Sequence, residues 1–309
     1  MKIGYPSINL SIDRRAGRPF VVLQRRSARA LNEAKANIGE LEQILQYNLE
    51  HNLMFFRIRP DLIPFASDPK VDVDWQKELG DPLRKIGGFI RAHNMRINIH
   101  PDLYTMINHP DQQQLNNAIR DLHYQAELLD LMELDSSAKI QVHVGERFSH
   151  DKEASIRAFE ERFVTLDDVI KRRMVIENEN VMCTFKDCLG IHVRTGLPIV
   201  PDVLHHEITG GSDGIRRVLE LASETWGACD GMMMVDYSSQ DPGRMTGKHA
   251  PGIKMEHFKA FIDASLEFDF DLMMEHKDRE SSALKAYEYL KDDPRVRRGL
   301  TEPPAASCD

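Results

Sequence analysis

The chain has 309 residues, with 40 lysines and arginines against 49 aspartates and glutamates, and its formal net charge is −9. This length excludes a peptide module or a small stapled domain, and it fits one large α/β barrel or two ordinary domains. A hydrophobic content of 41% excludes global disorder. The acidic balance argues mildly against a protein that coats itself with nucleic acid, but it allows a local basic groove.

Short apolar or β-branched runs alternate with segments of helical apolar spacing along the chain. The predicted strands are Lys2–Tyr5, Met54–Ile58, Arg96–Ile99, Lys139–Val144, Met174–Glu177, Pro198–Pro201, Gly231–Asp236 and Asp271–Glu275. The predicted helices are Leu31–His51, Gln113–Leu134, Ser155–Thr165, Thr184–Thr195, Gly214–Glu224, Met255–Phe268 and Glu280–Lys291. This alternation favours a parallel sheet with helical crossovers, and eight such units indicate a (β/α)8 TIM barrel. A doubly wound open sheet is the competing fold, but the first predicted strand lacks the glycine-rich turn that usually follows it there.

We predict one barrel domain over residues 1–294 and a loosely ordered C-terminal tail over residues 295–309, which contains Pro303 and Pro304. The connection between residues 10 and 31 is long and rich in arginine. Within it, Arg14, Arg15 and Arg18 are candidates for binding phosphate above the barrel mouth. A solvated surface loop is the alternative interpretation of this connection.

No N-terminal segment has the apolar run and small-residue cleavage site of a signal peptide. No stretch reaches the roughly 18 consecutive apolar residues that span a membrane. We therefore expect a soluble, cytoplasmic protein that does not act at a membrane. Nothing in the sequence implies a protein partner, and we expect a monomer.

Metal-ligand residue types follow six successive predicted strands and one later loop. They are His100, His143, Glu177, Asp202 with His205, Asp236, Glu275, and His249 in the loop after the seventh strand. Each residue alone is weak evidence, but in a barrel all these strand ends meet on one face. Buried carboxylates and imidazoles there need compensation, which divalent cations supply. Histidine and carboxylate ligands without thiolate suit Zn²⁺, Mn²⁺ or Fe²⁺, so we predict a multinuclear metal site.

A metal site of this kind suits two reaction classes. Adjacent cations can clamp a phosphodiester and neutralise its leaving oxygen, which favours hydrolysis of a phosphate ester. A metal-dependent sugar isomerase or epimerase is the alternative, because the same barrel and ligand types support it. An isomerase, however, has no need of an arginine-rich loop over its mouth.

At this point the residues match a family. From Met1 to about Glu280 the chain resembles the UV-damage endonucleases, barrel enzymes related to endonuclease IV. The motifs that carry the resemblance are GYPSINLS, FFRI, LIPFAS, NIHPDLY, VHVG, IENEN, VPDVLHH, SSQDP, GKHA and MMEHK. The resemblance implies a metal-dependent nuclease that nicks damaged double-stranded DNA immediately 5′ to a UV photoproduct, with other helix-distorting lesions or abasic sites as further substrates. It implies two or three divalent cations per chain, Mn²⁺ first and Zn²⁺ or Fe²⁺ as alternatives.

The resemblance also implies a role for each candidate ligand. His100, His143 and Glu177 would hold one cation. Glu177 would bridge to a second cation, and the other ligands of that cation would be Asp202, Asp236 and Glu275. His205 and His249 would belong to a third. The implied catalytic residues are Glu177, His143 and Glu275.

Four residues match the family's DNA-binding positions. Leu103 and Tyr104 occupy the place of residues that wedge into the duplex at the lesion, and Tyr5 and Asn9 match the first-strand motif that lines the lesion pocket. A wedge of this kind recognises damage as deformability of the duplex rather than as base sequence.

Four positions depart from the family pattern. Leu103 stands where a glutamine is usual and Asp68 where a histidine is common. Asp236 stands in the place of a histidine ligand, and Met234 in the place of a lysine that some members carry near the metals. We therefore expect the third cation site to be short of ligands.

Overall fold

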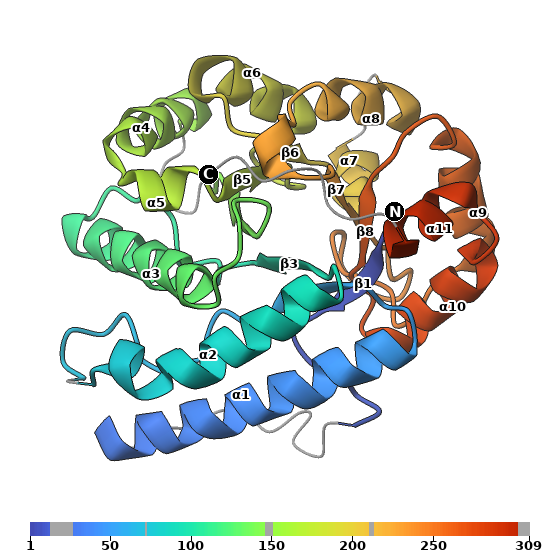
Figure 1. Cartoon of the computed structure of the whole chain (residues 1–309). Coiled ribbons are helices and arrows are strands. Elements are labelled where there is room, and N and C mark those ends of the chain that lie inside the picture. The colour runs from blue at the N-terminus through green and yellow to red at the C-terminus, as the bar shows by residue number, and fades with distance from the viewer. Residues whose placement is uncertain (13–26, 72, 146–150, 210–212, 302–309) are drawn as a thin grey trace.

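Eight parallel strands form the centre of the molecule, and helices surround them (Figure 1). The computed structural model describes residues 1–12, 27–71, 73–145, 151–209 and 213–301. The strands are β1 (Ile3–Pro6), β2 (Phe55–Ile58), β3 (Arg96–Ile99), β4 (Lys139–His143), β5 (Met174–Glu177), β6 (Ile199–Val200), β7 (Met234–Tyr237) and β8 (Asp271–Met274). Each predicted strand overlaps one of these, and the predicted TIM barrel is confirmed.

The barrel closes at a seam between β6 and β7. The ladder of strand pairs runs in the order β6-β5-β4-β3-β2-β1-β8-β7, so β6 and β7 are its two ends. An isolated parallel bridge joins Asp202 to Asp236 across these ends, and the backbone N–H of Asp236 donates to the carbonyl of Pro201 at 3.0 Å. Two candidate metal ligands therefore lie at the point where the ring closes.

Side chains alternate between the two faces of each strand, so apolar residues form one core inside the barrel and another under the helices. Phe55, Val175, Val200, Met234 and Met273 form an apolar cluster inside the barrel, apart from the larger core under the helices. Residues two positions further along each strand face the interior as well. The sequence thus places an apolar floor inside the barrel and polar side chains above it, toward the C-terminal ends of the strands.

The helices between the strands pack against the outer core. They are α1 (Ser27–Glu50), α2 (Trp75–Ala92), α3 (Gln112–Leu131), α4 (Lys152–Thr165), α5 (Asp168–Lys171), α6 (Phe185–Thr195), α7 (Val203–Thr209), α8 (Ile215–Ser223), α9 (Met255–Ala264), α10 (Glu280–Leu290) and α11 (Pro294–Thr301), with a 3-10 turn η1 (Ala228–Asp230). Helix α2 is not predicted from the sequence, because Pro82 and three glycines interrupt its apolar pattern. No helix in the described ranges is both long and apolar enough to cross a membrane.

The expectation of a loosely ordered tail from residue 295 is wrong for residues 295–301, which belong to α11. Arg295 is buried and ion-paired to Asp293 at 2.7 Å, and its Nη1 donates to the carbonyl of Ser265 at 2.8 Å. The Met1 amine donates to the Arg295 carbonyl at 2.6 Å. Buried polar contacts therefore fix this helix beneath the barrel, while residues 302–309 lie outside the described residues.

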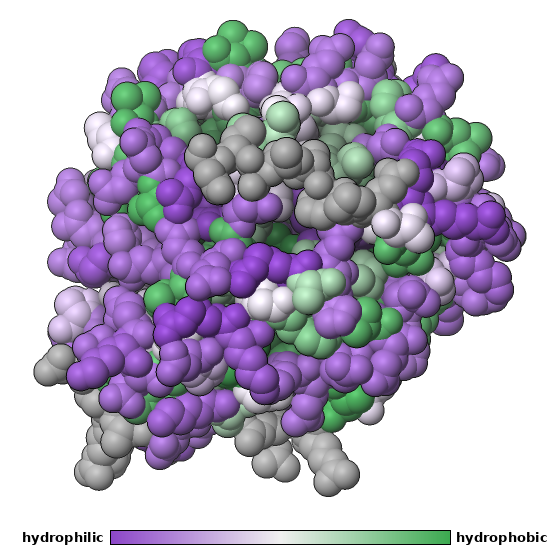
Figure 2. All heavy atoms as spheres, in the orientation of Figure 1, coloured by the Kyte–Doolittle hydropathy of each residue, from purple (hydrophilic) through white to green (hydrophobic). Residues whose placement is uncertain are grey.

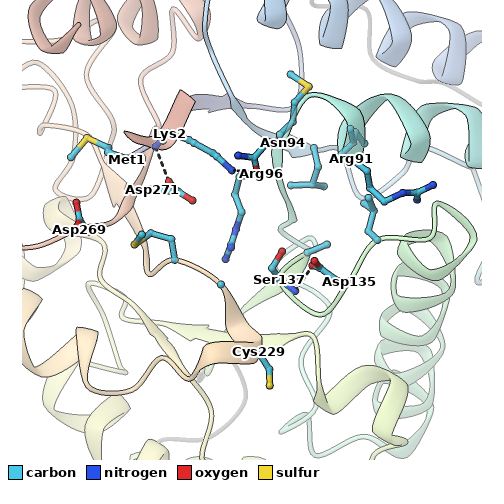
Figure 3. Close-up of a pocket in the computed structure, with 18 of the residues that line it drawn as sticks. Met1, Lys2, Arg91, Asn94, Arg96, Asp135, Ser137, Cys229, Asp269 and Asp271 are labelled. Carbon is cyan, nitrogen blue, oxygen red and sulfur yellow. Dashed lines mark hydrogen bonds between the residues drawn. The ribbon is translucent and has the colours of Figure 1, made fainter. Parts of the chain in front are cut away.

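A cavity of about 400 Å³ opens at the N-terminal ends of the strands (Figure 3). Its lining includes Lys2, Arg96 and Asp271, which precede or begin β1, β3 and β8. On the face drawn in Figure 2, hydrophilic residues predominate around smaller apolar spots. The cavity lies at the end of the barrel opposite the candidate ligands and is separate from them.

Two adjacent glycines of α2 provide a test of helix packing. A Cβ built on Gly87 meets the carbonyl oxygen of Met132 at 1.7 Å, whereas one on Gly88 meets nothing within 4 Å. We expect Gly87→Ala to lower the free energy of unfolding by roughly 1–3 kcal/mol, because the helix must move away from α3. Gly88→Ala should raise it by roughly 0.4–1 kcal/mol, because alanine loses less backbone entropy on folding. Urea denaturation of both variants checks this, and equal effects would contradict the packing described.

Candidate metal centre

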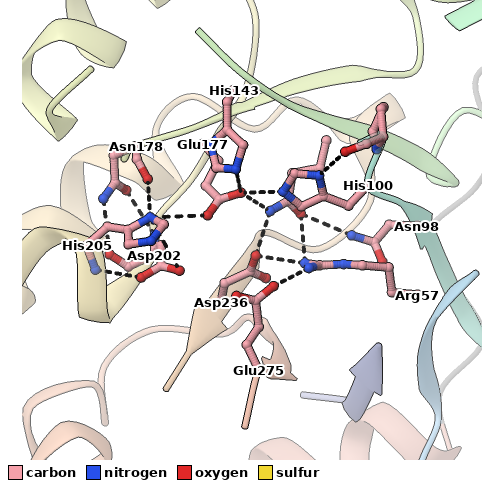
Figure 4. Close-up of polar contacts among 12 residues, drawn as sticks. Arg57, Asn98, His100, His143, Glu177, Asn178, Asp202, His205, Asp236 and Glu275 are labelled. Carbon is pink, nitrogen blue, oxygen red and sulfur yellow. Dashed lines mark hydrogen bonds and ion pairs between the residues drawn. The ribbon is translucent and has the colours of Figure 1, made fainter. Parts of the chain in front are cut away.

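The C-terminal strand ends bring seven of the eight predicted ligands together (Figure 4). They form three overlapping groups, each with ligand atoms within 4.8 Å of one another: His100, His143 and Glu177; Glu177, Asp202 and His205; Asp202, Asp236 and Glu275. Glu177 belongs to the first two groups and Asp202 to the last two. The groups therefore form one continuous centre with shared carboxylates.

Glu177 lies at the middle of the centre. It ends β5 and is 1% exposed. Its Oε2 faces Nε2 of His100 at 3.0 Å and Nε2 of His143 at 3.6 Å, and its Oε1 lies 3.6 Å from Nδ1 of His205. One carboxylate thus has its two oxygens directed at different histidines, which is the arrangement required of a bridging ligand.

His100 has an oxygen opposite each of its ring nitrogens. Nδ1 lies 3.0 Å from the carbonyl of Pro101, and Nε2 lies 3.0 Å from Oε2 of Glu177. If Nδ1 donates to the carbonyl, Nε2 of the neutral ring carries a lone pair that faces a carboxylate. A second proton or a cation must then lie between them. Outer hydrogen bonds of this kind fix the tautomer of metal-ligating histidines.

Asp202 is held by the start of α7. Its Oδ1 accepts from the backbone N–H of His205 at 2.7 Å, as a helix cap does. Asn178 accepts from the Asp202 N–H at 2.9 Å and donates to the Asp202 carbonyl at 3.1 Å. The carbonyl of Asn178 also lies 3.0 Å from Nδ1 of His205. The cap uses only one carboxylate oxygen, so Oδ2 stays available.

Two polar residues that the sequence analysis missed hold the third group. Arg57 of β2 donates to Glu275 and, at 2.7 Å, to Oδ2 of Asp236. Gln141 of β4 donates to Glu177 at 2.6 Å and to Asp236 at 2.5 Å. Both interrupt apolar strands at interior positions. That interruption is a signal in the sequence, but strand ends alone do not reveal it.

Burial and neighbouring charges push the pKa values of the centre apart. Burial lowers the pKa of His143 to about 4 and raises that of Asp202 well above its ordinary value. Burial alone would lower the pKa of His205, but Asp202 raises it to about 9. Burial would raise the pKa of Glu275, but Arg57 lowers it to about 2. Divalent cations bound here would therefore compete with protons for the same donor atoms.

The donor atoms fit divalent cations. Nδ1 of His143, Oδ2 of Asp202 and Oδ1 of Asp236 are buried and have no hydrogen-bond partner among the described residues. Such atoms are costly to bury unless something satisfies them. Nitrogen and carboxylate oxygen are the ligands of Zn²⁺, Mn²⁺ and Fe²⁺. The seven clustered residues are therefore suited to hold adjacent cations.

The eighth predicted ligand, His249, lies at the edge of this centre. Its ring centroid is 6.3 Å from that of His205, and its Nδ1 is 4.0 Å from Oε2 of Glu275. The Nδ1 atom also lies 2.7 Å from the hydroxyl of Ser238. His249 falls outside the three groups. Met234 lies in the apolar floor of the barrel.

The predicted DNA-contacting residues fall into three sets. Leu103 and Tyr104 are 52% and 73% exposed in the segment that follows β3. Tyr5 and Asn9 are fully buried, because the Tyr5 hydroxyl donates to Asn48 at 2.6 Å and accepts from Asn9 at 2.8 Å. These two side chains present no surface to DNA in this conformation. The third set, Arg14, Arg15 and Arg18, lies outside the described residues.

Comparison with known proteins places these features in a family. The family model described as UV-endonuclease UvdE matches residues 21–299. A UV DNA damage endonuclease of Clostridium perfringens is 34% identical over 294 residues, which cover 94% of this chain and 71% of that protein. A protein of the same name from Bacillus anthracis is 29% identical, covering 89% of this chain and 87% of the relative.

Solved structures of one protein with similar sequence and of two more distant proteins share this fold. The crystal structure of SacUVDE has a TM-score of 0.88 and 39% identity, covering 94% of this chain and 98% of its own. Endonuclease IV from Thermus thermophilus (TM-score 0.56, 15% identity) covers 83% of this chain and 94% of its own. A D-psicose 3-epimerase from Clostridium cellulolyticum (0.54, 13%) covers 84% and 90%. The last two show the fold alone. The family match and the strand-end residues together establish that this chain belongs to the UvdE family of UV-endonucleases.

Proposed function

We propose that this chain is a divalent-cation-dependent endonuclease that nicks double-stranded DNA immediately 5′ to UV photoproducts. Other helix-distorting lesions and abasic sites are further proposed substrates. The observation that carries the proposal is the continuous centre of histidines and carboxylates at one end of the barrel, with Glu177, Asp202 and Asp236 buried, in a chain of the UV-endonuclease family. We propose Mn²⁺ as the cation, with Zn²⁺ and Fe²⁺ as alternatives, and two or three cations per chain.

We propose a task for each residue of this centre. His100, His143, Glu177, Asp202, His205, Asp236 and Glu275 would hold the cations, with His249 as an outer ligand. Cations bound there would stabilise the negative charge that develops on a phosphodiester during hydrolysis. Glu177, His143 and Glu275 are the proposed catalytic residues. The apolar floor below them keeps bulk water away from one side of the centre.

Tyr104 and Leu103 are the proposed contacts to the lesion. They follow His100 by only a few residues, so they lie on the same end of the barrel as the centre. A large exposed aromatic ring suits insertion between bases, and unstacking costs least where damage already distorts the duplex. Arg14, Arg15 and Arg18 are proposed to bind phosphates of the same duplex.

A direct test uses a duplex with one photoproduct at a defined position, incubated with protein and Mn²⁺. We expect a single nick immediately 5′ to the lesion and none in the matched intact duplex. Cleavage of both duplexes alike, or no cleavage by protein shown to contain Mn²⁺, would contradict the proposal. The solved sugar epimerase resembles this chain in fold alone, so ketose substrates serve as the negative control.

We expect Glu177→Ala to lower the nicking rate by at least about 10²-fold, because it removes a shared ligand from the middle of the centre. Binding to damaged DNA should change little, since Glu177 is buried and contacts histidines rather than the surface. Single-turnover kinetics and a gel-shift titration measure the two effects. Glu161→Ala, which removes an exposed carboxylate on α4, is the control. Normal cleavage by Glu177→Ala would refute the ligand assignment.

Tyr104→Ala should weaken discrimination between damaged and intact duplex by about 1–3 kcal/mol, the contribution of stacking one base on an aromatic ring. Tyr104→Phe keeps the ring and should keep the discrimination. Competition binding with both duplexes measures the ratio, and the metal content of the variant should equal that of the wild type. An equal loss of affinity for both duplexes would argue against a wedge.

The stabilising effect of Mn²⁺ should depend on pH. Burial raises the pKa of Asp236 to about 7, although Arg57 opposes the rise. Below that pH the carboxyl group holds a proton that a cation must displace, so Mn²⁺ should raise Tm more at pH 8 than at pH 6. A cation at 100 times its Kd stabilises a protein by about 2.7 kcal/mol. Differential scanning fluorimetry of chelator-treated protein measures this. Asp236→Asn should reduce the pH dependence, and a larger effect at pH 6 would contradict the prediction.

A further inference from the structure

Arg57 places a permanent positive charge inside the candidate metal centre. It lies two positions after the apolar floor residue Phe55 on β2 and is 4% exposed. Its Nη1 donates to Oε1 of Glu275, and its Nη2 donates to Oδ2 of Asp236 at 2.7 Å (Figure 4). A buried ion is costly without partners, so the guanidinium and the two carboxylates require one another.

This charge differs in kind from that of the surrounding histidines. In the described part of the chain, Arg57 is the one arginine or lysine that forms an ion pair with a carboxylate of the centre. A histidine that ligates a metal does so as the neutral ring. A guanidinium stays protonated and has no lone pair to offer a metal. Arg57 would therefore keep its charge beside the cations.

Arg57 also selects which carboxylate oxygens are free. It occupies Oδ2 of Asp236 and Oε1 of Glu275. The other oxygen of Asp236, Oδ1, is buried without a hydrogen-bond partner among the described residues. The other oxygen of Glu275, Oε2, faces Nδ1 of His249 at 4.0 Å. Each carboxylate thus keeps one oxygen that a cation can use.

Gln141 secures this arrangement. Its Oε1 accepts from Arg57 at 3.1 Å and from Asn98 at 3.0 Å. Its Nε2 donates to Glu177 and Asp236. Only one orientation of the amide meets both demands, because the carboxylates need donors and Arg57 needs an acceptor. Side chains from β2, β3 and β4 therefore fix the carboxylates of β5 and β7.

We propose that Arg57 is a positioning residue that limits how tightly the Asp236–Glu275 side of the centre holds divalent cations. It does so by occupying one oxygen of each carboxylate and by keeping a positive charge beside them. The inference rests on the proposed function in one respect, that the centre binds divalent cations. Every additional carboxylate oxygen on a cation would reduce the positive charge left to act on a phosphodiester, so this limit serves hydrolysis.

The test is calorimetric titration of the full, chelator-treated chain with MnCl₂. Arg57→Met removes the charge, frees Oε1 of Glu275 and leaves Oδ2 of Asp236 bonded to Gln141 alone, so the Kd for Mn²⁺ should fall by about ten-fold or more. Arg57→Lys keeps the charge, and its Kd should stay within about three-fold of the wild type, since the charge is retained near the same carboxylates. Arg96→Met is the matched control: Arg96 is a buried arginine of the neighbouring strand at the opposite end of the barrel, so its removal should leave the Kd unchanged.

A Kd for Arg57→Met that equals or exceeds the wild-type value would overturn this inference and leave the proposed function standing. Failure of the wild type to bind Mn²⁺ or Zn²⁺ would overturn both. If circular dichroism shows that Arg57→Met does not fold, Arg57→Gln replaces it, because glutamine keeps a donor amide but lacks the charge. The same ten-fold criterion then decides.

Discussion

The centre is governed by an excess of buried negative charge. Glu177, Asp202, Asp236 and Glu275 converge at one end of the barrel, and Arg57 is their one ion-paired arginine or lysine among the described residues. Uncompensated buried charge is too costly for a protein of ordinary stability to carry. The remaining compensation must come from protons or from divalent cations. Burial raises the pKa of Asp202, so without a cation this carboxyl group more readily holds a proton. The orphaned donor atoms mark where cations would act instead.

The same carboxylates take part in closing the barrel. β6 and β7 meet through the bridge between Asp202 and Asp236, whose side chains both belong to the third ligand group. Asn178 reinforces the seam by binding the Asp202 backbone from β5. A ligand that binds only the closed arrangement stabilises it by mass action. A cation bound by these carboxylates would therefore also stabilise the closed ring.

The sequence predicted which side chains meet at the C-terminal end of the barrel, because these residues stand at or just after the ends of the predicted strands. Glu177 directly follows three apolar residues of β5, so its position at the rim could be inferred. Arg57 and Gln141 lie within strands, so only the direction of their side chains into the barrel marks them as part of the centre. Gln141 lies two residues before His143 and therefore faces the same side of β4. Helix α2 was not predicted because Pro82 has a low helix propensity, although packing against the rest of the protein forms the helix. Burial of Arg295 depends on contacts with residues distant in the chain, which no local pattern reveals.

The opposite end of the barrel shows how this fold treats buried charge where no metal is needed. Lys139 donates to Asp230 at 2.5 Å and to a carbonyl at 2.9 Å. Arg173 pairs with Asp130 at 2.6 Å and donates to three further carbonyls. Both of these buried side chains, Lys139 and Arg173, have a carboxylate and backbone oxygens to match their charge. At the C-terminal end carboxylates outnumber the lysines and arginines paired with them, and several buried donor atoms have no hydrogen-bond partner within the described ranges. Because one chain contains both arrangements, the excess is specific to the centre and does not follow from the acidic composition of the protein.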